Sequence, residues 1–242
     1  MPSLKRRSLP RRTPDPLTRG QKVRLTRLRH ALLAWYAEQG RDLPWRRDRA
    51  NTFERICVEV LLQRTRAGTV AKVYPSFFDR FRSWSDLAGA SLEELEGHFK
   101  PIGLWQRRAR SMKSLSTYAA ERKGRFPDTA TGLVGVPAVG QYLANAILVF
   151  QHGQNRPFLD VNMVRVIERY VRPRKLADIR FDPWLQEAAH WFVRGDRPID
   201  INWAVLDFAS AICTARNPRC AECPVARLCP SRHFYQETRS PS

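Results

Sequence analysis

Residues 213–229 read CTARNPRCAECPVARLC, and no other stretch of the chain constrains the fold as strongly. Its four cysteines have the spacing C-x6-C-x2-C-x5-C, and they are Cys213, Cys220, Cys223 and Cys229. Four thiolates within 17 residues can surround one small inorganic centre. Because thiolates are the usual ligands of iron–sulfur clusters, the spacing favours a [4Fe-4S] cluster that ties the C-terminal segment together.

Zinc and disulfide bonds are the alternatives for these cysteines. Zinc motifs of this kind mostly separate two C-x2-C pairs by about a dozen residues or more, whereas this run has one such pair. Structural disulfides need an oxidising compartment, and nothing at the start of the chain resembles a secretory signal. The fifth cysteine, Cys57, lies in the apolar run 56–62 and is expected to pack in a core.

The charge of the chain points to a polyanionic partner. Among 242 residues, 42 are Lys or Arg and 23 are Asp or Glu, which gives a net charge of +19. Phosphate backbones are the obvious polyanion for such a protein. No apolar run reaches the roughly 18 residues that a membrane helix needs, so no membrane partner is expected. A cytoplasmic, nucleoid-associated location fits free cysteines and a cluster.

The pattern of apolar residues predicts an all-α protein. Apolar side chains recur at helical spacing, and no turn signal joins two alternating runs into a β-hairpin. Residues 1–17 are rich in Arg, Pro and Ser and are expected to form a basic arm. Helices are predicted over 18–39, 52–65 with Thr52 as N-cap, 67–82, 91–98, 103–122, 140–152, 161–171, 182–193 and 198–212.

Residues 133–150, LVGVPAVGQYLANAILVF, predict two helices joined by a tight turn. Pro137 ends the first helix, and Gly140 permits the turn into the second. Such a turn exposes backbone amides at a helix N-terminus, which is a ready site for phosphate. An ordinary helical hairpin without a ligand is the simpler alternative.

Three segments together resemble the helix-hairpin-helix DNA glycosylases of the endonuclease III and MutY type. VPAVGQYLA (136–144) looks like the family hairpin LPGVG-x-x-x-A, and FLDVNMVRV (158–166) is similar to the segment that carries the family's catalytic aspartate. The cysteine run matches the family's cluster loop. The resemblance extends over roughly residues 25–232 and implies a two-domain all-α fold, with a helical barrel domain and a [4Fe-4S] cluster domain.

The resemblance also implies how the chain divides. We expect a cluster domain from 18–45 and 159–232, and a helical barrel domain over 46–158 that includes the hairpin. Residues 233–242 would form a tail. One departure from the family pattern is Ala138, which replaces the first hairpin glycine. We expect this alanine to be tolerated if its φ is negative.

Position 142 bears on the reaction type. Family members that form a Schiff base with the sugar carry lysine here, and this chain has Tyr142. A covalent imine needs an amine nucleophile, so the resemblance implies a DNA N-glycosylase without AP-lyase activity. Simple packing at the helix start is the alternative role for this tyrosine.

Two carboxylates are the other candidate catalytic groups. Asp160 precedes an apolar-periodic stretch and should cap the helix that follows. By resemblance it also stabilises an oxocarbenium-like sugar and positions water. Glu59 is flanked by apolar residues, and burial should raise its pKa and suit it to proton transfer or base recognition. An ion pair with Arg55 on an exposed helix face is the alternative for Glu59.

The resemblance further assigns residues that contact DNA. Gln63, on the same predicted helical face as Glu59, and Leu104 would fill the space left by an extruded nucleotide, with Trp105 stacking nearby. Basic residues of the cluster loop would grip phosphates. The full set of expected DNA contacts is Gln63, Leu104, Trp105, Val136, Ala138, Val139, Gly140, Gln141, Arg216 and Arg219.

The segments 59–68 and 102–109, with Tyr142, look closest to the thymine–DNA mismatch glycosylases. They imply a monomeric, monofunctional base-excision enzyme that binds double-stranded DNA with a mismatched or damaged base and hydrolyses thymine or uracil opposite guanine. A MutY-like adenine glycosylase is the first alternative, although few residues follow Cys229 to form a domain that reads 8-oxoguanine. A non-catalytic cluster protein that binds DNA is the second alternative.

Overall fold

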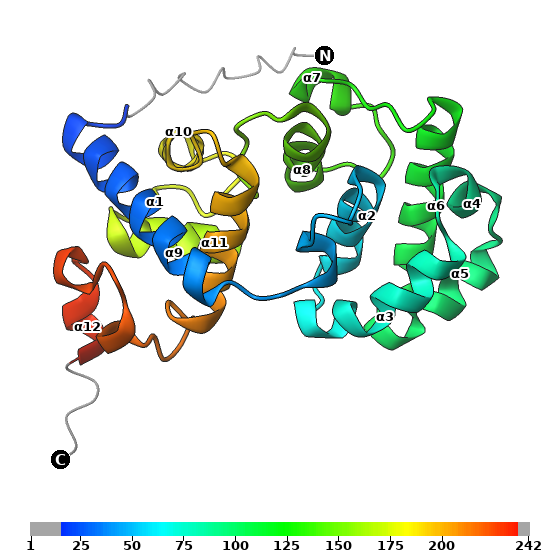
Figure 1. The fold of residues 1–242 in the computed structure, drawn as a ribbon. Helices are drawn as coiled ribbons and strands as arrows, with labels where there is room; N and C mark the ends of the chain where they lie inside the picture. The colour runs from blue at the N-terminus through cyan, green and yellow to red at the C-terminus, as the bar shows by residue number, and fades with distance from the viewer. Residues whose placement is uncertain (1–15, 237–242) are drawn as a thin grey trace, which may run out of the picture.

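The computed structural model describes residues 16–236, and within this range every regular element is a helix. The prediction of an all-α chain is therefore confirmed. The α-helices in Figure 1 are α1 (Arg19–Gln39), α2 (Thr52–Leu62), α3 (Ala67–Arg80), α4 (Trp84–Gly89), α5 (Leu92–Phe99), α6 (Trp105–Glu121), α7 (Ala130–Leu133), α8 (Gln141–His152), α9 (Val161–Tyr170), α10 (Pro183–Phe192), α11 (Pro198–Ala211) and α12 (Arg232–Gln236). Short 3-10 turns are η1 (Pro44–Arg46), η2 (Lys100–Ile102), η3 (Cys220–Glu222) and η4 (Ala226–Leu228).

The predicted start and end of α2 were both wrong. Asn51, not Thr52, is the N-cap, because its side chain accepts a hydrogen bond from the Glu54 amide at 2.9 Å. The helix ends at Leu62, and the chain leaves the helical path after the C-cap residue Gln63, whose φ is −56° and ψ 110°. Thr52 and Asn51 are both good capping residues, and only the side-chain geometry decides between them.

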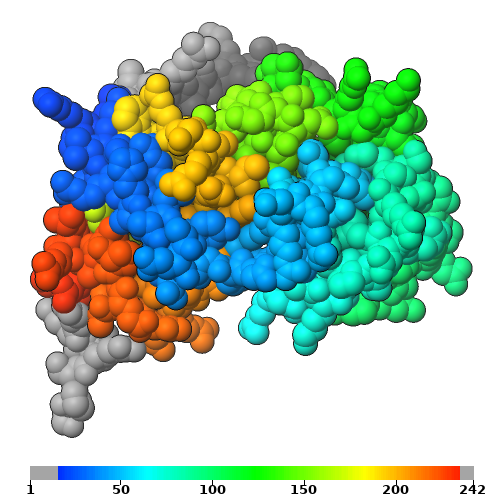
Figure 2. Space-filling model, in the orientation of Figure 1, coloured from blue at the N-terminus to red at the C-terminus, as the bar shows by residue number. Residues whose placement is uncertain are grey.

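The helices enclose two hydrophobic cores. One core is built by residues between 43 and 158 together with Trp203, and it lies among α2 to α8. The second core joins Leu17 and α1 to α9, α10 and α11. Helix α1 and the segment after α11 meet in this second half, on the left of Figures 1 and 2, where Arg24 of α1 donates to the Leu228 carbonyl at 2.9 Å.

The expected ends of the terminal segments need correction. Leu17 is not part of a free arm, because it is 5 % exposed and its amide donates to Glu187 Oε2 at 3.2 Å. Helix α12 runs four residues into the expected tail, to Gln236. The rest of the predicted arm and tail lies outside the described residues. Within 16–236, no helix has the length and apolar character needed to cross a membrane.

A buried ion cluster lies where the chain passes from one core to the other. Asp207 of α11 is 1 % exposed and accepts two hydrogen bonds from Arg46, at 2.6 and 2.9 Å, and others from Arg41. Burial alone would raise the pKa of Asp207, but the two arginines outweigh it and hold the pKa below its usual value. Trp203 and Tyr36 lie against the Arg46 guanidinium at 5.2 and 5.9 Å. This cluster fixes the linker between α1 and α2 against α11.

Candidate active site and cluster site

Glu59 is a buried carboxyl group in the middle of α2. Glu59 is 2 % exposed, and its neighbours Val58 and Val60 belong to the first core. The Tyr142 hydroxyl of α8 donates to Glu59 Oε2 at 2.9 Å. Burial raises the pKa of Glu59 to about 7, although Tyr142 and Arg46 oppose the rise. The group can therefore both hold and release a proton near neutral pH.

Tyr142 is tied to this carboxyl group rather than merely packed at the helix start. It is half-buried in the first turn of α8, and its ring lies 5.7 Å from that of Phe158. Burial, together with the negative charges of Glu59 and Asp160, raises the pKa of Tyr142 well above its usual value. The hydroxyl therefore keeps its proton and acts as a donor. This pairing joins residues 83 positions apart, which sequence spacing alone does not reveal.

Asp160 is the N-cap of α9, as its position predicted. Its Oδ1 accepts the amides of Asn162 and Met163, both at 2.9 Å. Burial raises the pKa of Asp160, and these hydrogen bonds oppose the rise. Its charge also raises the pKa of Glu59, which places the two carboxyl groups in one electrostatic environment.

Sequence reasoning missed the side chains that hold Asp160. The Asn162 side-chain amide donates to Asp160 Oδ2 at 2.6 Å. Arg165, one turn further along α9, donates to Asn162 Oδ1 at 3.1 Å and thereby fixes which way the amide points. The only available signal was their spacing at two and five residues after a predicted N-cap, which many helices share.

Gln63 and Leu104 lie on two different loops that face each other. Both are exposed, and both line one small pocket together with Arg64 and Arg107. Gln63 is the C-cap residue of α2, one residue beyond the end of the helix. Leu104 has a positive φ of 52° and caps the start of α6 beside Trp105, which is 40 % exposed.

The hairpin turn presents free backbone amides. Among the described residues, the amides of Ala138, Gly140 and Gln141 donate to no backbone carbonyl in the turn, whereas those of Val136 and Val139 do. The Val136 side chain is 4 % exposed, so it packs inward and offers no contact surface of its own. The Gln141 side chain is exposed and donates to Gln186 at 2.9 Å. Free amides at the start of α8 suit a phosphate group.

Ala138 does not meet the condition under which the alanine was expected to be tolerated, because its φ is +61°. A glycine can adopt this left-handed region at no steric cost, whereas an alanine there is strained by about 1–2 kcal/mol. The turn holds Ala138 in this strained conformation because the amides of Val136 and Val139, on either side, form hydrogen bonds with backbone carbonyls.

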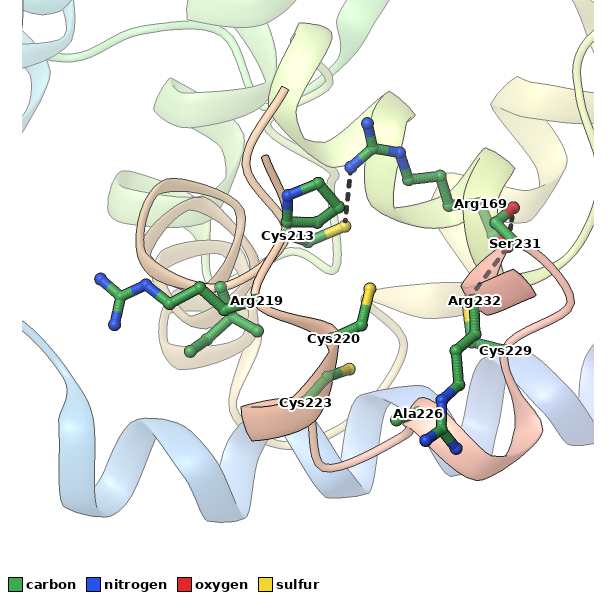
Figure 3. Close-up of a pocket in the computed structure, with 11 residues that line it drawn as sticks. Arg169, Cys213, Arg219, Cys220, Cys223, Ala226, Cys229, Ser231 and Arg232 are labelled. Atoms are coloured by element: carbon green, nitrogen blue, oxygen red, sulfur yellow. Dashed lines mark hydrogen bonds between the residues drawn. The ribbon is translucent and has the colours of Figure 1, made fainter. Parts of the chain in front are cut away.

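The four C-terminal cysteines surround one pocket (Figure 3). Cys213 follows α11, Cys220 begins η3, and Cys223 and Cys229 come directly after η3 and η4. Among residues 16–236, no three His, Cys, Asp or Glu side chains are grouped closely enough to hold a single metal ion. Four thiols around one pocket are the ligand set of an iron–sulfur cluster, in which the thiolates are spread over several irons.

Burial raises the pKa of Cys223 to about 11, so the positive charge of a metal centre is what would keep these sulfurs as thiolates. Arg169 of α9 lies beside them and donates to Cys213 at 3.5 Å (Figure 3). In the cluster loop, Arg216 is exposed, and Arg219 forms a surface ion pair with Glu222 at 3.2 Å. Cys57 is buried in the first core, as predicted.

Comparison with known families identifies both halves of this arrangement. Residues 57–178 match the model of the HhH-GPD superfamily base excision DNA repair proteins. Residues 213–229 match the iron-sulfur binding domain of endonuclease III, and this segment contains all four cysteines. The [4Fe-4S] assignment made from the spacing is thereby confirmed.

Several characterised proteins are similar over most of the chain. The thymine/uracil-DNA glycosylase of Pyrobaculum aerophilum is 36% identical over 92% of this chain and 97% of its own length. The thymine-DNA glycosylase of Aeropyrum pernix is 36% identical over 86% of this chain and 95% of its own. The human adenine DNA glycosylase is 34% identical over 88% of this chain, which spans only 41% of that relative.

Solved structures agree on the fold. A thermostable thymine-DNA glycosylase superposes with a TM-score of 0.79 at 29% identity and covers 89% of this chain and 99% of its own. An endonuclease III–DNA covalent intermediate superposes with a TM-score of 0.75 at 23% identity, which supports the fold alone. The chain thus belongs to the HhH-GPD superfamily of base excision DNA repair proteins and is an iron–sulfur DNA N-glycosylase.

Proposed function

We propose that this protein is a monofunctional mismatch glycosylase that hydrolyses the N-glycosidic bond of thymine or uracil opposite guanine. The observation that carries the proposal is the hydrogen bond between Tyr142 and Glu59. The position of the family's Schiff-base lysine is thus occupied by a protonated phenol, and a phenol cannot form an imine with the sugar. The relatives named as thymine or uracil glycosylases match almost their whole length, which supports the same choice of base.

In the proposed reaction, the target nucleotide leaves the duplex and its base binds next to Glu59. Positive charge develops on the sugar as the base departs, and the Asp160 carboxylate stabilises that charge and orients water toward C1′. Asn162 and Arg165 keep Asp160 in place through their hydrogen bonds. With a pKa of about 7, Glu59 can donate a hydrogen bond or proton to the departing base.

Three surfaces would hold the DNA. The free amides of the hairpin turn at 138–141 would bind a phosphate, and the exposed Arg216 of the cluster loop would bind another. Gln63 and Leu104 would fill the space left by the extruded base, and Trp105 would stack nearby. We propose that a monomer is sufficient, because one chain supplies all these groups.

The cluster would be held by Cys213, Cys220, Cys223 and Cys229. When bound, it supplies a structural cross-link for a segment that has only short 3-10 turns of its own. Hydrolysis of a glycosidic bond transfers no electrons, so the proposed reaction needs only that the cluster keep the loop in shape. The two domains divided at about residues 46 and 159 would then close on the DNA from either side.

Adenine removal is the second candidate, and one specific observation favours it. A carboxyl group with a pKa of about 7 could protonate adenine as it leaves, and adenine glycosylases are among the similar proteins. Tyr142 and the full-length match to thymine and uracil enzymes favour the first candidate.

The two candidates separate in one assay of base release. Four duplexes that differ only in the central pair, T·G, U·G, A·G and A·8-oxoguanine, would be incubated with excess enzyme. The proposal predicts release from T·G and U·G. Release confined to adenine would replace it with the second candidate, and Glu59 would then be the general acid. Release from none of the four would reject both.

A further inference from the structure

Arg108 of α6 is a buried cation without an acidic partner among the described residues. It is 5 % exposed, and burial lowers its pKa. Burying a charge is costly unless hydrogen bonds compensate it. The compensation comes from backbone and hydroxyl oxygens, which together use all three guanidinium nitrogens.

These oxygens belong to the end of α2 with the loop that follows it, and to the loop before α6. At the end of α2, Arg108 Nη1 donates to the carbonyls of Val60 and Leu61 at 2.7 and 2.8 Å. Nη2 donates to the Gln63 carbonyl at 3.2 Å and to Thr65 Oγ1 at 2.9 Å. The last carbonyls of a helix lack partners within the helix, so the guanidinium both caps α2 and holds the loop that follows it.

The Arg108 guanidinium also contacts the second loop, residues 102–104. Arg108 Nε donates to the Gly103 carbonyl at 3.4 Å, and the Thr65 hydroxyl donates to the Ile102 carbonyl at 3.2 Å. Arg108 and Thr65 therefore join loop 63–65 to loop 102–104. Gln63 and Leu104 project from these two loops and line one pocket with Arg108.

Both loops contain a strained residue. Arg64 and Leu104 have positive φ values of 58° and 52°. Each costs about 1–2 kcal/mol in a non-glycine residue, and such conformations persist only where surrounding contacts determine them. The hydrogen bonds of Arg108 on either side of Arg64 and just before Leu104 are such contacts.

We propose that Arg108 is a positioning residue that locks the two loops at a fixed separation, so that Gln63 and Leu104 enter the duplex as one rigid wedge. The inference rests on the proposed function, because it assumes that both side chains replace an extruded nucleotide. Without the lock, each loop would relax independently. Extrusion of the base would then fail, while the chemistry at Glu59 and Asp160 would be unaffected.

Two variants separate this role from a general need for positive charge. Arg108→Lys keeps the charge but cannot reproduce a planar fork of donors. Thr65→Val keeps the shape of the side chain and the Arg108 charge, but removes the hydroxyl that joins the loops. Arg110→Lys is the matched control, because Arg110 lies two residues along α6 and is exposed. Thermal melting would establish that each variant is folded.

The first readout does not depend on activity. A duplex with 2-aminopurine beside a central T·G pair would be saturated with protein, and fluorescence would report unstacking as the wedge enters. Wild type and Arg110→Lys should raise the fluorescence, and Arg108→Lys and Thr65→Val should lose most of that rise. An equal rise in all four proteins, or an equal loss in Arg110→Lys, would overturn the proposal.

The second readout separates extrusion from chemistry. Thymine release under single turnover would be compared between a T·G pair and a thymine opposite an abasic analogue, where extrusion costs less. Arg108→Lys should slow release from T·G by about tenfold or more and leave the unpaired thymine little affected. Equal slowing on both substrates would overturn the proposal. If wild type released no base, the proposed function would fail, and the fluorescence result would still decide for or against the lock.

Discussion

The buried site around Glu59, Tyr142 and Asp160 and the exposed turns of this protein are built in opposite ways. In the buried site, Glu59 and Tyr142 project from regular helices and have strongly shifted pKa values, and neither has a positive φ. In the turns, Leu104 and Ala138 have positive φ, and their side chains are exposed and uncharged. The buried site therefore has its unfavourable free energy in desolvated ionisable groups, and the turns have theirs in backbone strain. Substitutions in the buried site should change the rate and the pH dependence of rate and stability, whereas substitutions in the turns should change positioning or relieve strain.

Among substitutions in the buried site, Asp160→Asn should have the largest effect on the rate of base release. Asparagine caps helices about as well as aspartate, so α9 should persist, but the negative charge beside the sugar is lost. We expect base release to fall by about 10³-fold while DNA affinity stays near that of wild type. Single-turnover release and a binding titration measure the two quantities. A variant that keeps more than about a tenth of the rate would show that Asp160 is a structural cap only.

The pH dependence tests the role of Glu59 as a proton donor. Because its pKa is raised to about 7, the donor form should disappear as the pH rises through that value, and the rate should fall about tenfold per pH unit above it. Glu59→Gln should lower the rate by about 10²-fold and remove this alkaline limb. A rate that increases through pH 7 would instead make Glu59 a base.

The same shift has a consequence for folding stability. A carboxyl group whose pKa rises from 4.5 to about 7 on folding contributes its full stability below the lower value and loses it as the pH rises through the higher one. Glu59→Gln should therefore melt at a higher temperature than wild type at pH 8, and by a smaller margin at pH 5. A lower melting temperature at pH 8 would indicate that the ionised carboxylate is well solvated.

Much of the buried site around Glu59 and Asp160 could be predicted from the sequence, whereas little of the turns could be. Asp160 could be identified as an N-cap and Glu59 as a costly charge in an apolar helix, because burial and capping depend on local pattern. The pairing of Glu59 with Tyr142 required the packing of α2 against α8, which no local pattern encodes. The positive φ of Ala138 and the contacts of Arg108 were equally invisible, because both depend on tertiary constraints.

Tyr142→Phe should have a moderate effect on stability and on the pH–rate profile. The phenylalanine keeps the packing on Phe158 but leaves Glu59 without its donor, which costs about 1–3 kcal/mol for a buried polar group. Since that hydrogen bond lowers the pKa of Glu59, its loss should move the alkaline limb of the pH–rate profile upward. An unchanged profile would mean that the Tyr142 hydroxyl does not contact Glu59 in solution.

Ala138→Gly should give the smallest effect, in the hairpin turn. Glycine relieves the strain of φ +61°, although its unfolded chain is more flexible. We expect a net gain of about 1 kcal/mol, or a melting temperature higher by about 2–4 °C, with DNA affinity equal to or better than that of wild type. A drop in melting temperature would show that the turn is not left-handed at this position.

The central claim is that this enzyme hydrolyses the glycosidic bond without a covalent link to the sugar, because Tyr142 occupies the position of the Schiff-base lysine. The most direct measurement is strand integrity after base release from a T·G duplex, analysed with and without alkali, together with borohydride trapping. The account predicts an intact strand that breaks only in alkali, and no trapped protein–DNA complex. Strand scission without alkali and a trapped complex would contradict it.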